Sequence, residues 1–173
     1  LALERECISQ AADTARKLNV RIAIENVNPN PRILAGEHFC YALDIRRLAE
    51  QIEAIDDPIV CTTLDFSHAY IASSYLGIDY ASALQRVAPT VGHLHIHDSF
   101  GRPGTMTLSS DDAQLAYGMG DLHLPLGWGD IDYPALLPEM QIRPDSIMTI
   151  ELKSRYRSEA AETIARAREY AEL

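Results

Sequence analysis

The chain has few cysteines, glycines and prolines, and each shortage argues against a class of protein. Its three cysteines are scattered over 173 residues, and no pair has the spacing of a zinc finger or a redox motif. A disulfide framework and a thiolate metal site are therefore not expected, and a reducing cytoplasm is the simplest compartment. Nine glycines and nine prolines are too few for a fibrous or low-complexity chain. No run approaches the roughly 18 apolar residues of a membrane helix.

Positive charge is also in short supply. Fifteen Lys and Arg stand against 25 Asp and Glu, which gives a formal net charge of −10. This balance repels nucleic acid phosphates and anionic membrane surfaces, and the densest basic segment is only residues 153–157. We therefore expect no membrane partner, and the charge argues against a nucleic acid partner. A hydrophobic content of 47% with 23% charged residues is typical of a globular protein, and the length indicates one domain over residues 1–173.

Helical and extended patterns alternate along the chain. Apolar residues at helical spacing predict a first helix over roughly residues 2–18. Short apolar runs rich in β-branched residues predict strands at 20–24, 59–64, 91–96 and 146–150. Strands separated by helices are typical of β/α units with a parallel sheet, and continuous apolar strands indicate that both faces of the sheet are covered.

Capping residues place the later helices. Asp44, Asp79 and Ser158 are predicted N-caps of helices, and a short helix is predicted near residues 134–140. The last helix is expected to bury Ala161, Ile164, Ala165 and Tyr170. The segment 98–130 contains six glycines and little periodicity, so we predict a long loop there.

A polar side chain stands at the end of each predicted strand. In chain order these residues are Glu25, Asp65, His95 and Glu151. Because the C-terminal ends of parallel strands face the ligand in α/β folds, we expect these four side chains to converge. Any one of them alone could form a structural salt bridge or loop hydrogen bond. Jointly they favour a metal or catalytic site, with an oxygen-rich donor set that suits Mn²⁺, Co²⁺, Mg²⁺, Fe²⁺ or Zn²⁺.

Four histidines lie close to these strand ends in the sequence. His68 follows Asp65 by three residues, so a single turn could aim both side chains at one centre. His93, His95 and His97 alternate and therefore point to the same side of their strand. Only the one at the end of the strand is expected to reach the site, and His93 is expected to be a hydrogen-bonded core histidine.

The long loop carries further polar groups. Asp98 is predicted to orient a ligand histidine. Asp121 and His123 place a second carboxylate and imidazole two residues apart, for which a solvated loop is an equal alternative. A tight turn at 127–130 carries Trp128, the only tryptophan, toward a predicted pocket.

The ordered series of motifs resembles the xylose isomerase-like TIM barrel superfamily, which includes sugar phosphate isomerases and epimerases, ketose 3-epimerases, inosose-handling enzymes and type IV AP endonucleases. The motifs are Ile24-Glu25-Asn26, Leu64-Asp65-Phe66-Ser67-His68, His95-Ile96-His97-Asp98, the segment from Asp121 to Asp132, and Ile150-Glu151. Together they cover nearly the whole chain. The series is specific for the superfamily but does not choose the member.

The resemblance implies roles for individual residues. Glu25, Asp65, His95 and Glu151 would bind a divalent metal, as their counterparts on family strands five to eight do. His68 would contact substrate, as in epimerases, or a second metal, as in the endonucleases. Arg102 lies near the position of an epimerase substrate-binding arginine. Asp121 and His123 resemble the third-zinc pair of the endonucleases, and sugar-enzyme relatives carry a comparable segment.

The same resemblance predicts about half a barrel. A complete barrel has eight strands and about 250 residues, and this chain supplies the equivalent of strands five to eight. We therefore expect the C-terminal half of a TIM barrel with two exposed sheet edges, which needs the missing half or a second copy. The sequence opens inside an amphipathic pattern and shows no signal peptide, so the native N-terminus is expected upstream.

The resulting hypothesis is a metal-dependent isomerase or epimerase of a small sugar, sugar phosphate or polyol-derived ketone. Glu25 and Glu151 would transfer protons on a substrate chelated by Mn, Co, Mg or Zn. His68, Arg102, His123 and Trp128 would contact the sugar. One alternative is an endonuclease-like zinc phosphodiesterase acting on DNA, supported by His68, Asp121 and His123. The other is a truncated barrel domain without catalytic activity.

Overall fold

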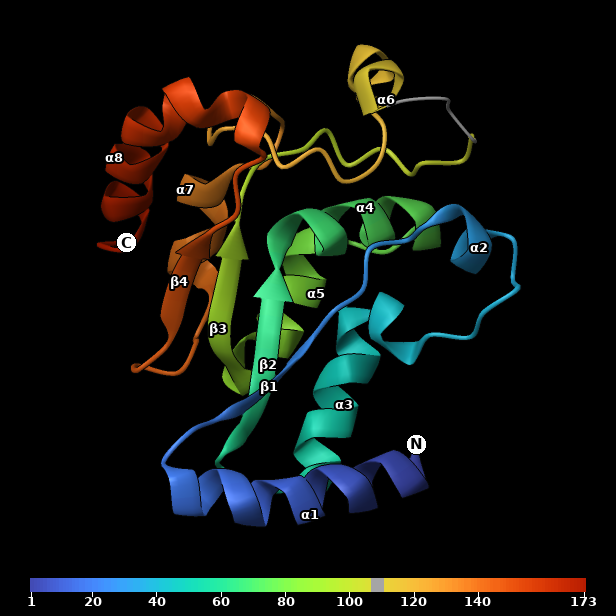
Figure 1. The fold of residues 1–173 in the computed structure, drawn as a ribbon, viewed down its shortest axis with the longest axis vertical. Helices are drawn as coiled ribbons and strands as arrows, with labels where there is room; N and C mark the ends of the chain where they lie inside the picture. The colour runs from blue at the N-terminus through green and yellow to red at the C-terminus, as the bar shows by residue number, and fades with distance from the viewer. Residues whose placement is uncertain (107–110) are drawn as a thin grey trace.

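The computed structural model describes residues 1–106 and 111–173, with the backbone alone at residues 111 and 112. Four parallel strands form one sheet in the order β1-β2-β3-β4, which confirms the predicted α/β class. The strands are β1 Ile22–Glu25, β2 Val60–Asp65, β3 Val91–Ile96 and β4 Ile147–Ile150. Among the described residues, β1 and β4 each have a neighbouring strand on one side only. The architecture is that of a partial barrel (Figure 1).

Helices connect the strands, and α1 lies across the lower end of the sheet while α6 stands above its upper end (Figure 1). The α-helices are α1 Ala2–Leu18, α2 Pro31–Leu34, α3 Ile45–Ile55, α4 Phe66–Leu76, α5 Tyr80–Val87, α6 Asp111–Tyr117, α7 Tyr133–Leu136 and α8 Ala160–Tyr170. Short 3₁₀ segments are η1 Tyr41–Leu43, η2 Ala88–Thr90, η3 Leu137–Glu139 and η4 Ser154–Glu159. None of the described helices is long and apolar enough to cross a bilayer.

The two-residue period of the strands separates an apolar outer face from a polar inner face. Leu64, Leu94 and Ile96 point outward into the main core with helices α3, α5 and α7. Their neighbours Asp65 and His95 point inward and lie opposite each other in the β2–β3 register. The prediction that all strands are covered on both faces holds for β2, which is buried throughout, but not for the end strands. Ile147 of β4, for example, is 62% exposed.

Aspartate caps start the helices α3 and α5 as predicted. The Asp44 side chain accepts a hydrogen bond from the Arg46 N–H at 3.0 Å, and Asp79 accepts one from Ser82 at 2.8 Å. The predicted Ser158 cap is wrong. The 3₁₀ segment η4 already includes Ser158, whose hydroxyl instead donates to Glu159, and α8 begins two residues later.

Two further differences concern helices. Sequence periodicity did not predict α4, because this helix is buried on several sides and carries no single apolar stripe. On α8 the buried residues are Thr163 and Ala167. Of the residues predicted to be buried there, Ala161, Ile164 and Ala165 are exposed and only Tyr170 is partly buried. The long segment predicted as loop contains α6, and its residues 107–110 lie outside the described residues.

Candidate metal centre

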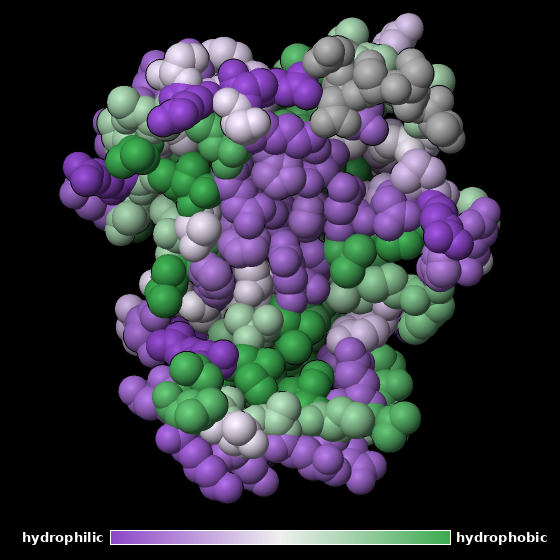
Figure 2. Space-filling view, viewed as in Figure 1, coloured by the Kyte–Doolittle hydropathy of each residue, from purple (hydrophilic) through white to green (hydrophobic). Residues whose placement is uncertain are grey.

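The four strand-end residues lie at one edge of the sheet. Glu25 and Asp65 are the last residues of β1 and β2, His95 is the penultimate residue of β3, and Glu151 follows β4. The Glu151 N–H donates to the Ile96 carbonyl at 3.1 Å, which continues the parallel pairing past the end of β4. Figure 2 shows this edge as a hydrophilic region at the centre of the viewed face, bordered below by apolar residues.

Three of the four predicted ligands approach one imidazole nitrogen of the fourth, His95. Nδ1 of His95 lies 3.2 Å from Oε1 of Glu25, 3.2 Å from Oε1 of Glu151 and 4.0 Å from Oδ2 of Asp65. Ligand atoms that share one tetrahedral ion at about 2.1 Å are about 3.4 Å apart. The two 3.2 Å separations are close to this value, and the separation from Asp65 is longer. Among the described residues, no grouping of potential ligand atoms within 4.8 Å of one another includes His95. The donor chemistry of three carboxylates with one imidazole fits a divalent cation such as Zn²⁺, Mn²⁺ or Co²⁺.

Asp65 is held rigidly at the centre of this arrangement. Its side chain is completely buried and caps α4, because Oδ1 accepts the His68 N–H at 2.8 Å. Oδ2 accepts a hydrogen bond from Nε2 of His97 at 3.0 Å. Burial by itself would raise the pKa of Asp65, but the His97 hydrogen bond and the charges of His97 and His68 outweigh it and lower the pKa to about 2. The carboxylate is therefore ionised and fixed in orientation.

Asn26 holds the backbone at the end of β2. Its Nδ2 donates to the Asp65 carbonyl at 3.0 Å, and its Oδ1 accepts the Asp65 N–H at 2.8 Å. The two bonds continue the ladder between β1 and β2 after regular pairing has ended. Asn26 thereby places Asp65 relative to the neighbouring Glu25.

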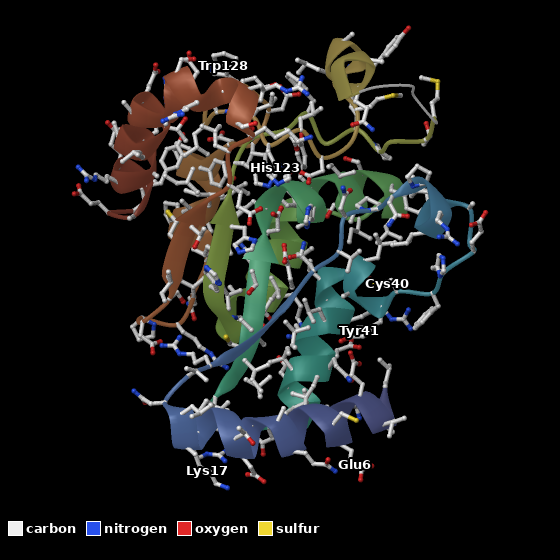
Figure 3. The ribbon with its side chains drawn as sticks, in the orientation of Figure 1. Glu6, Lys17, Cys40, Tyr41, His123 and Trp128 are labelled. Atoms are coloured by element: carbon white, nitrogen blue, oxygen red, sulfur yellow. The ribbon has the colours of Figure 1, made fainter. Side chains whose placement is uncertain are left out.

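A second cluster lies beside the first and comes largely from the long loop. Oδ2 of Asp121 is 3.2 Å from Nε2 of His68 and 3.1 Å from Nδ1 of His123. Nε2 of His123 is 3.3 Å from Oε2 of Glu151, and the His123 ring stacks on His97 at 4.1 Å. His123 has a φ of 48°, a left-handed conformation that is uncommon for a residue other than glycine. Figure 3 shows His123 above the ends of the central strands.

Three groupings of side chains bring potential ligand atoms within 4.8 Å of one another. They are Glu25 with Asp65 and His68, Asp65 with His97 and Glu151, and His97 with Asp121 and His123. Because the groupings share members, the two clusters form one continuous network.

Charge in the network shifts the titration of His68. Burial opposes protonation, but the hydrogen bond to Asp121 and the charges of Asp65 and Asp121 outweigh it and raise the pKa of His68 to about 9. The stability that this histidine contributes is thus fully present below about pH 6.5 and is lost as the pH rises through about 9.

We therefore expect the metal-free protein to lose stability between these two pH values, by up to about 3 kcal/mol. The measurement is urea unfolding in the presence of a chelator at a series of pH values. His68→Gln should flatten the profile, whereas His38→Gln, in an exposed loop, should leave it unchanged. A wild-type profile that is equally flat would contradict the assignment.

The side chains of two residues predicted to contact substrate have partners outside the two clusters. Arg102 is exposed, donates to the Tyr117 carbonyl at 3.1 Å and lies 5.9 Å from the centre of the Phe100 ring. Trp128 is 50% exposed and packs edge-on against Tyr156. Figure 3 shows Trp128 at the periphery, close to η4 and α8.

Asp98 organises the loop rather than a histidine. Its carboxylate accepts backbone N–H bonds from Ser99, Gly127 and Ile131 at 2.9, 2.8 and 3.2 Å. A Cβ at Gly129 would lie 2.4 Å from both Asp98 Oδ1 and the Ser99 carbonyl, so only glycine permits this close approach. The prediction that Asp98 orients a ligand histidine is wrong, because these N–H groups occupy its carboxylate.

His97 is the site residue that sequence reasoning missed. It follows the last residue of β3 and continues the inward alternation of His93 and His95, so the spacing itself contained the signal. We expected only the histidine at the strand end to reach the site. His93 bonds Oγ1 of Thr149 at 2.7 Å, as expected of a hydrogen-bonded histidine, but it is only partly buried and its ring lies edge-on to that of His95, with the ring centres 4.9 Å apart.

Comparison with known proteins places this geometry among related folds. The model of a family described as xylose isomerase-like TIM barrel matches residues 1–172. Comparison with curated proteins gives no significant match.

Three solved structures resemble the chain. A D-tagatose 3-epimerase-like protein has a TM-score of 0.66 and 21% identity, with 97% of this chain and 53% of that one covered. The IOLI protein with a bound zinc atom has a TM-score of 0.64 and 21% identity, with coverages of 96% and 53%. AsbF of Bacillus anthracis, a probable 3-DHS dehydratase involved in petrobactin synthesis, has a TM-score of 0.61 and 17% identity, with coverages of 94% and 55%. At these identities the likeness shows the fold alone. This chain spans about half the length of each of them.

Proposed function

Because this chain belongs to the xylose isomerase-like TIM barrel family, we propose that it forms part of a metal-dependent isomerase or epimerase. The proposed substrate is a small sugar, sugar phosphate or polyol-derived ketone. Its main support is the convergence of Glu25, Asp65 and Glu151 on Nδ1 of His95. The structural neighbours support it, since they include a D-tagatose 3-epimerase-like protein and a protein with a bound zinc atom.

The chemistry follows from the positions of the two glutamates. Glu25 and Glu151 come from β1 and β4, the two end strands of the sheet, and approach His95 from opposite directions along it. When bound, a divalent cation supplies polarisation of a carbonyl and an adjacent hydroxyl. One glutamate then removes the proton from the carbon between these groups, and the other delivers a proton to the opposite face.

A pocket of about 210 Å³ beside Asp121 and His123 offers room for the rest of the substrate. Its lining includes the polar residues Asn28, Asn30, Gln114 and Lys153. The buried Oδ1 of Asn28 lacks a hydrogen-bond partner in the described residues, so a substrate hydroxyl could donate to it. This polar lining suits a hydroxylated small molecule.

We propose the activity for a closed barrel. Among the described residues, β1 and β4 each pair with a neighbouring strand on one side only. Exposed edges of a sheet readily pair with other chains, so further strands from a longer form of the protein or from a second copy would close the barrel.

Hydrogen exchange tests the proposal directly. The closed barrel, formed by the full-length protein or by two copies of the chain, is loaded with Mn²⁺, Co²⁺ or Zn²⁺ and incubated in D₂O with ketoses, ketose phosphates and inososes. We expect deuterium to enter the substrate at the carbon that bears a hydroxyl next to the carbonyl, as read by proton NMR. If no substrate in this panel gains deuterium while metal is bound, the proposed function is wrong.

The cluster of His68, Asp121 and His123 favours a second candidate, a zinc phosphodiesterase acting on DNA. The net charge of −10 opposes it, because duplex binding depends on Lys and Arg contacts to phosphate.

Metal content separates the candidates. We expect one tightly held divalent ion per chain after dialysis against Zn²⁺, measured by elemental analysis, and Asp121→Asn should leave that number unchanged. Three zinc ions per chain, falling in the Asp121→Asn variant, would favour the nuclease. A folded protein that retains no metal would favour a barrel domain without catalytic activity.

A further inference from the structure

His97 is a polar side chain in a completely buried position. Both its side chain and that of Asp65 have no exposed surface. Its one side-chain hydrogen bond in the described residues joins Nε2 to Oδ2 of Asp65 at 3.0 Å, and Nδ1 has no hydrogen-bond partner there. An imidazole buried with one nitrogen unsatisfied costs stability compared with an apolar side chain of similar size. The group that His97 bonds therefore indicates its role, rather than a contribution of His97 to the free energy of unfolding.

His97 bonds the carboxylate of Asp65, at the centre of the candidate metal site. Each carboxylate oxygen of Asp65 can accept about two hydrogen bonds or ligand contacts. Oδ1 caps α4 through the His68 N–H, and Oδ2 takes the His97 bond while lying 4.0 Å from Nδ1 of His95. The two bonds fix the carboxylate at both oxygens, with Oδ2 oriented toward the common centre.

His97 is itself held from two sides. Its backbone carbonyl accepts the hydroxyl of the buried Tyr133 at 2.7 Å, and its ring stacks on His123 at 4.1 Å with an angle of 3° between the planes. The ring therefore has little freedom to turn away from Asp65. His97 thus connects Tyr133 of α7 and His123 of the long loop to Asp65, the proposed metal ligand.

We infer that His97 is a positioning residue, which presents Oδ2 of Asp65 to the cation without binding the cation itself. The inference rests on the proposed function, since it takes Asp65 as a metal ligand. Partners that orient a metal ligand typically change metal affinity by 10–100-fold when removed.

The test compares two replacements of His97. His97→Met removes the donor and keeps an apolar side chain of similar length, whereas His97→Gln places an amide N–H near the position of Nε2. Zn²⁺ affinity is measured by calorimetry, and the visible spectrum of bound Co²⁺ reports the ligand geometry. We expect His97→Met to weaken Zn²⁺ binding by about 10–100-fold and to alter the Co²⁺ spectrum, and His97→Gln to restore most of both.

A control comes from a histidine elsewhere in the chain. His38 is exposed, so His38→Met should leave Zn²⁺ affinity and the Co²⁺ spectrum close to wild type. Urea unfolding of each variant with a chelator shows whether the variant is folded.

The outcomes distinguish this inference from the function on which it rests. If wild type binds Zn²⁺ and a folded His97→Met variant binds it equally well with the same Co²⁺ spectrum, the positioning role is wrong and the proposed function stands. If His97→Gln is as impaired as His97→Met, the hydrogen bond is not the cause and the inference also fails. If wild type binds no divalent cation, the proposed function fails and the role of His97 with it.

Discussion

Glu25→Gln and Glu151→Gln are each expected to lower substrate turnover by about 10²–10⁴-fold, the range in which a positioned general acid or base contributes. Glutamine keeps the size of the side chain but cannot accept or deliver the proton at the substrate carbon. Each substrate isomer presents its proton to one of the two glutamates. In the variant that lacks this glutamate, deuterium exchange should fall together with turnover. The measurement is initial rate at saturating metal, together with exchange by NMR.

Glu162→Gln provides the control for both changes. Glu162 lies on α8, is exposed and pairs with Arg166 at 3.0 Å, so the same substitution there should leave turnover unchanged. Both glutamates are also predicted ligands, and metal content must therefore be measured in each variant. If both variants with full metal occupancy keep wild-type turnover, the proton-transfer roles are wrong.

Asp65→Ala is expected to lower the free energy of unfolding of the metal-free protein by about 3–5 kcal/mol. The substitution removes the helix cap from His68 N–H and leaves the completely buried His97 without its hydrogen-bond acceptor. Asp65→Asn should cost less, because an amide oxygen can still cap α4. Both should abolish tight Zn²⁺ binding, since neither supplies a carboxylate.

Asp79→Ala is the matched comparison for a cap alone. Asp79 caps α5 through Ser82 N–H at 2.8 Å at an exposed position, so its loss should cost about 1 kcal/mol. Urea unfolding with a chelator gives both values. Equal losses at Asp65 and Asp79 would show that the buried network around Asp65 adds nothing beyond the cap.

The local pattern of the sequence was sufficient for the sheet and for the strand-end residues. Each strand is a short apolar run, and its period of two dictates which residues point inward once the sheet is parallel. Glu25, Asp65, His95 and Glu151 could therefore be named as candidate ligands without coordinates. Their joint contact with Nδ1 of His95 then depends on the register, which pairs Asp65 with His95.

Other features had no local signal. Helix α4 is buried on several sides, so its apolar residues form no stripe that a helical period could reveal. Asp98 resembles a residue that orients a metal ligand, but the fold of the loop surrounds it with backbone N–H groups. Arg102 and Trp128 lie in loop segments. The side chain of Arg102 bonds the Tyr117 carbonyl, and that of Trp128 packs against Tyr156, and neither contact is encoded in a local pattern.

The sequence by itself thus determined the β/α alternation and the four polar residues at the strand ends, because both follow from short-range periodicity. The tertiary structure alone decided that His97 reaches Asp65 and that the long loop brings Asp121 and His123 to the same place. The contacts of His97 with Asp65 and of Asp121 with His68 join residues 32 and 53 positions apart, and the sequence pattern does not pair these residues. They arise only when parallel strands and packed helices bring distant side chains to one edge of the sheet.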